Sequence, residues 1–126
     1  MQETLAKIAD SELEVLKLLW RGGKPMTMPE IREALRLTTG WNGSTIKTFL
    51  YRLCDKGVVR AEKQGSFRYA PLISEQEYNE YANGVFLDKL YNGSVKNLLA
   101  SLIGSKKLTD SDIAELRGMF KVGEQE

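Results

Sequence analysis

The chain has 126 residues, 42% of them hydrophobic, with 18 Lys and Arg against 17 Asp and Glu. These values indicate one domain with a hydrophobic core, or a small domain with an appendage, and they exclude a disordered tail. No apolar run reaches the roughly 18 residues that a membrane-spanning helix needs, and the N-terminus contains no apolar signal segment. We therefore expect a cytoplasmic protein without membrane insertion.

Histidine is absent, and cysteine occurs once, at Cys54. The composition therefore excludes Ser-His and Cys-His nucleophile pairs, the commonest metal ligand and an internal disulfide. No phosphate-binding glycine loop and no familiar catalytic signature occurs in the sequence. Scattered carboxylates and lysines leave other kinds of catalysis open, but we expect neither an enzyme nor a protein that binds a cofactor or a metal.

Charge is divided unevenly along the chain. Residues 1–72 contain 12 Lys and Arg and 8 Asp and Glu, whereas residues 73–126 contain 6 and 9. A basic part beside an acidic part suggests that only one of them has a polyanionic partner. An imbalance of this size also occurs among soluble domains that bind no polyanion, so charge alone decides nothing.

The first helix is predicted at residues 10–20. Asp10 or Ser11 can cap it, and Ser11 with Glu14 fits a capping box, in which two residues exchange side-chain and backbone hydrogen bonds. Large apolar residues then recur every three or four positions, which is typical of an amphipathic helix. The following sequence RGGKP is predicted to end the helix, because paired glycines and a proline destabilise helical structure.

The second helix is predicted to begin at Thr27. Thr27 and Glu30 repeat the capping-box pattern, and Pro29 falls in the first turn, where proline is tolerated. A buried stripe follows, formed by Ile31, Ala34 and Leu35. The sequence TTGW then forms a short turn before the next helix.

The third helix is predicted from the cap Asn42 to Gly57, a residue type that commonly follows a helix end. Each residue turns about 100° around the axis, which separates two faces. The apolar face contains Ile46, Phe49, Leu50 and Leu53. The other face carries hydroxyl groups, an amine, a phenol and a guanidinium instead of the usual Glu and Lys mixture. Its residues are Ser44, Thr45, Lys47, Thr48, Tyr51 and Arg52.

After Gly57 the sequence alternates with a period of two, which predicts β-strands. Gln64-Gly65 lies between two alternating runs, where a hairpin turn favours a residue that tolerates positive φ. Three helices followed by a hairpin predict a winged helix-turn-helix. The expected fold class is therefore mainly α, with a winged-helix domain at 1–72 and a C-terminal helical dimerisation arm at 73–126.

This fold suggests a function for the polar face of the third helix. In a helix-turn-helix the second helix of the pair lies in the major groove, where such side chains bind phosphates and base edges. The predicted DNA-binding residues are Asn42, Ser44, Thr45, Lys47, Thr48, Tyr51 and Arg52, with Lys63, Ser66 and Arg68 on the hairpin, or wing. The alternative is a winged-helix protein-interaction module or adaptor, whose wing cations only keep the hairpin soluble.

Two neighbouring residues also have structural interpretations. Cys54 lies at the edge of the apolar face of the third helix, where a buried structural thiol is expected rather than a reactive one. Trp41 comes just before the same helix and either packs against the core or contacts the end of a duplex. Packing is the expected role, because a tryptophan beside a helix start more often packs than binds.

Residues 73–126 predict further helices. Ser74 with Glu77 and Thr109 with Asp112 fit helix starts, and the sequence Asn-Gly-Ser at 92–94 separates two helical runs. Large apolar residues are too numerous here for short helices to bury alone. We expect two copies to bury them against each other, the alternative being a monomer in which these helices fold back on the winged helix. The predicted dimerisation residues are Phe86, Leu90, Val95, Leu98, Leu99, Leu102, Ile113, Leu116 and Phe120.

Five segments resemble, in order, the penicillinase-repressor (BlaI/MecI/CopY) family: LEVLKLLW, TMPEIREAL, GWNGSTIKTFLYRLCDKGVV, GSFRYAPLISEQEY and FLDKLYNGSVKNLLASLI. The family comprises bacterial winged-helix repressors that bind palindromic operator DNA as homodimers. An N-terminal domain reads DNA and a C-terminal helical arm makes the dimer. The resemblance implies that Thr45, Lys47, Thr48 and Arg52 occupy recognition-helix positions and that residues 63–68 form the wing.

The resemblance further implies control of β-lactam or cell-wall-stress response genes and release from DNA by an inducer-triggered event. In the β-lactam-responsive branch, a membrane-sensor pathway leads to cleavage of an Asn-Phe bond in the C-terminal domain. The matching position here is Ser101-Leu102. The implied partners are therefore operator DNA, a second copy of the chain and a protease linked to a membrane sensor.

The chain also departs from the family pattern. The family often has Ser-Pro where this chain has Asn42-Gly43, and Tyr51 stands where a small or polar residue is common. The Asn-Phe pair is missing at the matching cleavage position. The copper-responsive branch carries paired C-terminal cysteines, which are absent here, so metal sensing through that motif is not expected.

Overall fold

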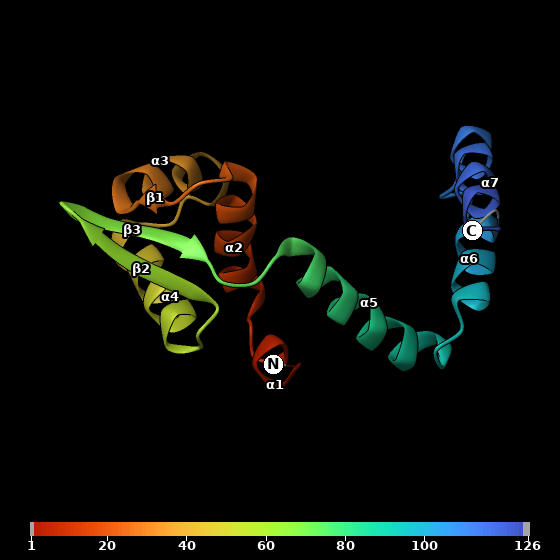
Figure 1. The fold of residues 1–126 in the computed structure, drawn as a ribbon, viewed down its shortest axis with the longest axis horizontal. Helices are drawn as coiled ribbons and strands as arrows, with labels where there is room; N and C mark the ends of the chain where they lie inside the picture. Colours follow the sequence, from red (N-terminus) through yellow and green to blue (C-terminus); the bar gives the residue numbers. More distant parts are fainter. Residues whose placement is uncertain (1, 125–126) are drawn as a thin grey trace. The chain divides into compact units, whose positions relative to one another are not determined.

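The computed structural model describes residues 2–124, with side chains up to residue 120 (Figure 1). The chain forms two compact units, Met1–Ala82 and Asn83–Glu126, and the division falls within one helix. The functional division after Leu72 stays a prediction, but the first compact unit extends ten residues further along the chain. None of the helices in the described part of the chain has the length and apolar character needed to cross a membrane.

The first unit is a winged helix-turn-helix, as predicted. Its three main helices are followed by a hairpin, while a short N-terminal helix and a two-residue strand were not predicted. A further helix begins in this unit and continues into the second. The elements are α1 (Gln2–Ala6), α2 (Asp10–Gly22), β1 (Met26–Thr27), α3 (Met28–Thr39), α4 (Gly43–Asp55), β2 (Val59–Gln64), β3 (Ser66–Pro71) and α5 (Glu75–Tyr91).

The start of α2 differs from the prediction. Its N-cap is Ala9, whose backbone N–H donates a 2.9 Å hydrogen bond to Oε1 of Glu12. The predicted caps Asp10 and Ser11, and the predicted capping box of Ser11 with Glu14, are therefore wrong, because both residues already lie inside the first turn. Glu12 is only 1% exposed and also accepts a hydrogen bond from the ammonium group of Lys56. Alanine has no side-chain acceptor for a capping hydrogen bond, so the sequence pattern indicated Ser11 as the cap instead of Ala9.

The starts of α3 and α4 follow the sequence. Thr27 and Glu30 form a reciprocal capping box at α3, and Asn42 Oδ1 accepts a 2.8 Å hydrogen bond from Thr45 N at α4. Gly40 has φ 71° between the two helices, a conformation that favours glycine because it has no Cβ. These caps fix the turn between α3 and α4.

The sheet has the strand order β1-β3-β2, with both pairs antiparallel. Gln64 pairs with Ser66, so the predicted hairpin turns at Gly65, where φ is 80°. The unpredicted strand β1 pairs Met26 with Tyr69 and Thr27 with Arg68. A two-residue strand is too short to show any alternation in the sequence, which is why the pattern did not indicate it.

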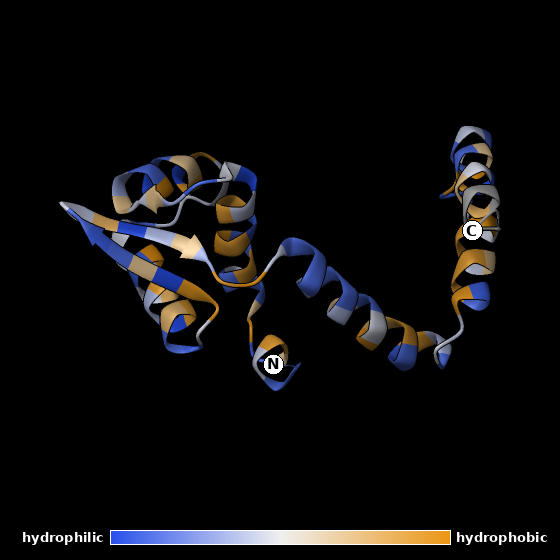
Figure 2. Ribbon diagram, viewed as in Figure 1, coloured by the Kyte–Doolittle hydropathy of each residue, from blue (hydrophilic) through white to orange (hydrophobic). Residues whose placement is uncertain are grey.

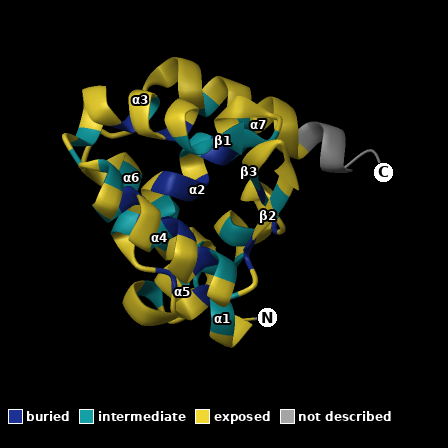
Figure 3. Ribbon diagram, turned by 90° about the vertical axis from the view of Figure 1, so that its left-hand side faces the viewer, coloured by how far each residue is buried: buried dark blue, intermediate teal, exposed yellow. Residues whose placement is uncertain are grey.

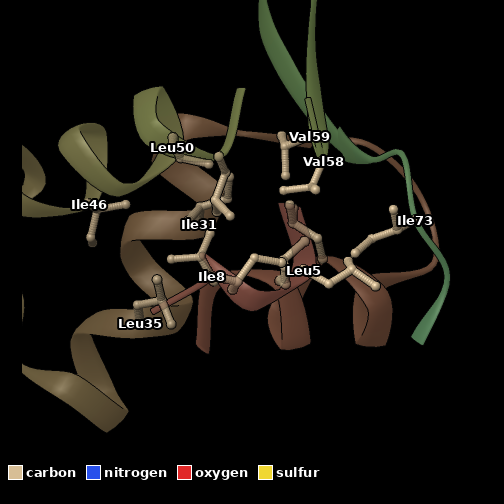
Figure 4. Packing of buried hydrophobic residues seen from close by; sticks show 13 residues of the cluster. Leu5, Ile8, Ile31, Leu35, Ile46, Leu50, Val58, Val59 and Ile73 are labelled. Atoms are coloured by element: carbon tan, nitrogen blue, oxygen red, sulfur yellow. The ribbon is translucent and has the colours of Figure 1, made fainter. Parts of the chain in front are cut away.

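The core of the first unit lies between α1, α2, α3, α4 and the start of the wing (Figure 4). The apolar stripes of α3 and α4 contribute to this cluster, and α2 carries prominent orange, hydrophobic segments (Figure 2). Ile73 closes the core beyond β3. The buried side chains of this cluster are Leu5, Ile8, Val15, Leu16, Leu19, Ile31, Leu35, Ile46, Leu50, Leu53, Val58, Val59 and Ile73.

The first turns of α5 pack on the winged helix. The indole N–H of Trp20 donates a 2.9 Å hydrogen bond to the carbonyl oxygen of Ile73. The ring of Trp20 lies 6.1 Å from that of Tyr78, which in turn lies 6.4 Å from that of Tyr81. These contacts explain why the first compact unit continues to Ala82.

The second unit contains the end of α5, α6 (Val95–Gly104) and α7 (Asp110–Glu124). Helix α5 ends at Tyr91 and is followed by Asn92 and Gly93, which have φ values of 49° and 81°. The predicted caps Ser94 and Thr109 accept hydrogen bonds from the amides of Asn97 and Asp112. No side chain from residue 83 to residue 120 is buried (Figure 3).

The predicted dimerisation residues all lie on these three helices. Phe86, Leu90, Val95 and Phe120 are exposed, whereas Leu98, Leu99, Leu102, Ile113 and Leu116 are half-buried. The unit therefore displays a large apolar surface. Within the unit, Tyr91 Oη donates a 3.3 Å hydrogen bond to Ser101 Oγ, and the ring of Phe86 lies 5.9 Å from that of Tyr91.

Candidate nucleic-acid interface

Helix α4 separates into two faces, as its sequence predicts. Ile46 and Leu53 are 0% exposed and Leu50 is 1% exposed, so three successive turns are anchored in the core. The opposite face is open to solvent, and Tyr51 is 72% exposed. The exposed side chains on this face are Ser44, Lys47, Thr48, Tyr51 and Arg52, while Thr45 is half-buried. A rigid helix thus presents hydroxyl, amine, phenol and guanidinium groups together.

Two polar groups on this helix already have partners. The side-chain oxygen of Asn42 caps the helix, and the hydroxyl of Thr48 donates a 3.1 Å hydrogen bond to the carbonyl oxygen of Ser44. Thr48 therefore presents its methyl group and the remaining acceptor capacity of its oxygen rather than a donor. Lys47 and Arg52 are the cationic donors of this face, and they lie on either side of Thr48 and Tyr51.

Arg32 belongs to this surface but was missed from the sequence. A hollow of about 610 Å³ lies between the starts of α3 and α4, lined by Met28, Arg32, Asn42, Gly43, Ser44 and Lys47. A Cβ placed on Gly43 would lie 3.0–3.2 Å from the guanidinium of Arg32, so this cation sits directly over the first residue of α4. Arg32 looks like an ordinary surface residue of α3 in the sequence, and only the packing of α3 against α4 reveals its place.

The wing does not bring its predicted residues together. Directly opposite residues of an antiparallel pair share a face, and successive residues alternate between faces. Lys63 pairs with Phe67 on one face, whereas Arg68 pairs with Glu62 and Ser66 with Gln64 on the other. Lys63 and Ser66 are exposed, and Arg68 is half-buried. Of the three, Lys63 shares its face with the wing residues that line a hollow against α4.

Two groups beside α4 remain neutral at ordinary pH. Burial raises the pKa of the Cys54 thiol, and burial together with the neighbouring Cys54 raises the pKa of the Tyr69 phenol. A thiolate is the reactive form of cysteine, so the predicted structural role of Cys54 fits its surroundings. Trp41 packs edge-on against Phe49 with 5.0 Å between ring centroids, which confirms its packing role.

A helix-turn-helix with a hairpin wing and a cationic, hydroxyl-bearing exposed helix face defines the winged-helix class of nucleic-acid-binding proteins. The family model described as penicillinase repressor matches residues 8–121. The chain therefore belongs to the penicillinase repressor family, which confirms the resemblance found in the sequence. This is a family of repressors and not of enzymes.

Individual relatives agree with the family assignment. The chain is 35% identical over 113 residues to the penicillinase repressor of Bacillus licheniformis, covering 89% of this chain and 88% of that protein. It is 27% identical over 121 residues to the methicillin resistance regulatory protein MecI of Staphylococcus aureus, covering 95% and 98%.

A solved structure matches the winged-helix part. The monomeric form of Bacillus licheniformis BlaI, solved in solution in complex with the blaP half-operator, has a TM-score of 0.51 and 38% sequence identity. The match covers 57% of this chain and 88% of that chain.

Proposed function

We propose that this protein is a transcriptional repressor that binds operator DNA through the exposed face of α4. The observation that carries the proposal is the separation of faces on this helix. Ile46, Leu50 and Leu53 anchor it, and the opposite face holds side chains suited to phosphates and base edges. The related BlaI structure was solved with a half-operator bound, which supports the same use of the fold here.

The proposed DNA contacts are of two kinds, with base edges and with phosphates. Lys47 and Arg52 lie on either side of the exposed face of α4, Arg52 in its last turn, and in the major groove either cation would contact a base edge, where both types favour guanine, or a phosphate. Arg32 and the exposed hydroxyl of Ser44 lie at the helix start, where contacts with phosphates set the register of the protein on the duplex. Lys63 extends the cationic surface onto the wing.

We further propose that the repressor is a homodimer joined by its second unit. Residues 83–120 contain no buried side chain, although α6 alone carries five large aliphatic residues. Pairing with another copy would remove this surface from water, which is the main driving force for association. A two-fold dimer would bind a palindromic operator whose half-sites are about 10 base pairs apart, or a multiple of that.

The proposed regulation of DNA binding uses the division of the chain into a DNA-reading unit and a dimerising unit. The names of the relatives support control of genes for β-lactam or cell-wall-stress responses. Release would follow from separating the DNA-reading unit from the dimerising unit, for example through cleavage at Ser101-Leu102 by a protease linked to a membrane sensor. This bond lies in the last turns of α6, where the Ser101 carbonyl accepts a 3.0 Å hydrogen bond from Ser105 N. The end of the helix would therefore have to unwind before cleavage.

The test is to incubate the purified full chain with fragments of the source genome and to sequence the fragments that it retains. We expect a small set of promoter regions that contain a palindrome. Their affinity should fall steeply with salt, because each phosphate contact releases counterions. Absence of any retained duplex, together with salt-insensitive binding to a protein partner, would show instead that the chain is a protein-interaction module.

A further inference from the structure

A small hollow lies between α4 and the wing. Its volume is about 250 Å³, and it is lined by Lys47, Tyr51, Cys54, Ala61, Phe67 and Tyr69. The three residues from α4 are spaced by four and three positions, so they form one stripe along the helix. The three from the sheet share one face of the hairpin, because Ala61 pairs with Tyr69 and Phe67 pairs with Lys63. The hollow is thus built by two elements with fixed register.

Two of the side chains that line this hollow are exposed aromatic rings. Tyr51 is 72% exposed and Phe67 is 52% exposed, although large aromatic residues gain stability mainly when they are buried. Neither belongs to the core cluster. Exposed apolar residues that gather in one place commonly mark a binding surface, and these two lie where the DNA-reading face of α4 meets the wing.

The half-buried residues that line the hollow are neutral, and two exposed cations lie beside them. Burial raises the pKa values of Cys54 and Tyr69, so both remain uncharged at ordinary pH. Lys47 lines the hollow, and the ammonium nitrogen of Lys63 lies 5.9 Å from the centroid of the Phe67 ring. A largely apolar lining beside two cations suits an apolar group that is carried by a polyanion.

We propose that this hollow receives the 5-methyl groups of thymine bases in duplex DNA, with Tyr51 and Phe67 as residues that set a preference for thymine. Among the base edges in the major groove, thymine alone presents a methyl group. The volume is below the roughly 300 Å³ at which small-molecule sites begin, which argues against a metabolite. The inference rests on the proposed DNA-binding function and adds a specificity residue, Phe67, that the sequence did not indicate.

The experiment begins with duplexes enriched from a random library by the full chain. Each thymine in the enriched sequence is then replaced in turn by deoxyuridine, which removes only the 5-methyl group. At one or two positions in each half-site we expect binding to weaken about three- to fivefold, the effect of burying one methyl group. Phe67→Ala and Tyr51→Ala should bring the ratio of thymine to uracil affinity towards one at those positions. Phe67→Leu, which keeps an apolar side chain, should retain part of it.

Two controls separate this role from others. Leu37→Ala removes an exposed apolar side chain from α3 and should leave the ratio unchanged. Phe67→Ala should also leave the salt dependence of binding unchanged, because it removes no cation. Far-UV circular dichroism checks that each variant is folded.

The outcomes distinguish the inference from the proposed function. If no duplex is enriched, the proposed function fails and this inference fails with it. If a duplex is enriched but every thymine tolerates uracil, DNA binding stands and the inference is overturned. Retention of the full ratio by both Phe67→Ala and Tyr51→Ala would overturn it as well.

Discussion

The two units differ in whether their helices close a core. In the first unit, side chains from α1 to β2, together with Ile73 beyond β3, meet in one cluster whose central members are almost wholly inaccessible to solvent. In the second, residues 83–120 lie mostly in the helices α5, α6 and α7, yet none of their side chains is buried (Figure 3). The comparison shows that both units form helices, but that among the described residues only the first unit forms a buried core.

The hydrogen bonds that cap helix starts are equally well formed in both units. Thr27 with Glu30 in the first unit and Thr109 with Asp112 in the second form the same pair of reciprocal hydrogen bonds at a helix start. Only the first of these helices, α3, continues into a buried stripe, with Ile31 fully buried. We infer that the first unit can fold alone, whereas the second gains its stability from another copy.

The largest expected effect comes from removing the second unit. A fragment of residues 1–82 retains the core, the Trp20–Ile73 hydrogen bond and the whole exposed face of α4. We expect it to be folded and to bind a two-half-site duplex about 10²- to 10⁴-fold more weakly than the full chain, because effective concentration no longer helps the second half-site. Fluorescence anisotropy measures the change. Equal affinity of fragment and full chain would mean that the second unit does not join two copies.

The second-largest effect is expected from shortening a large apolar side chain, and it should differ between the two units. Leu50→Ala opens a cavity in the closed core and should lower the free energy of unfolding by about 2–5 kcal/mol. Leu99→Ala in half-buried surroundings should instead make unfolding and dimer mass more dependent on protein concentration. Urea unfolding at several protein concentrations measures both effects. A concentration-independent loss of similar size for Leu99→Ala would indicate that the second unit has a core of its own.

Loss of a cation from the exposed face should affect binding but not stability. Arg52→Ala should weaken operator binding by about 1–3 kcal/mol if the guanidinium contacts a base edge, and Lys47→Ala should reduce the salt slope by about one if the amine contacts a phosphate. Lys96→Ala, an exposed lysine in the second unit, is the matched control. Unchanged affinity in a folded double variant of Lys47 and Arg52 would place α4 outside the groove.

The smallest effect concerns the matched helix caps. Hydrogen bonds from the backbone N–H and hydroxyl of Thr27 hold the pKa of Glu30 below its usual value, and those of Thr109 do the same for Asp112. A carboxylate with a lowered folded-state pKa stabilises fully above its unfolded pKa, and this stabilisation is lost as the pH falls through the folded value.

Thr27→Ala should therefore cost about 1 kcal/mol of stability near neutral pH and less in acid. Thr109→Ala should leave unfolding of the 1–82 core unaffected. Thermal unfolding from neutral to acidic pH measures both, and an equal loss at every pH for Thr27→Ala would exclude this role for Glu30.

Much of the fold could be predicted because its signals are local. The faces of α4 follow from residue spacing, and the wing follows from alternation around Gly65. The signals failed where a feature depends on residues distant in sequence. Strand β1 exists because β3 offers it hydrogen-bond partners, and Arg32 joins the interface because α3 packs beside the start of α4.

The wing shows the same limit within a single hairpin. Lys63, Ser66 and Arg68 were predicted as one group from their charge and polarity. The register places Lys63 with Phe67 on the face towards α4, and places Arg68 on the other face, opposite Glu62. Alternation in the sequence reveals that two faces exist, but only the packing of the sheet against α4 shows which one meets the recognition surface.

The most direct test of the account is the sedimentation of labelled two-half-site duplex with increasing amounts of the full chain and of the 1–82 fragment. The account predicts that two full-length chains join the duplex together, without a complex that contains one chain, whereas the fragment adds one copy at a time. A complex of one full-length chain per duplex as the first product, or a folded fragment that binds no duplex, would contradict it.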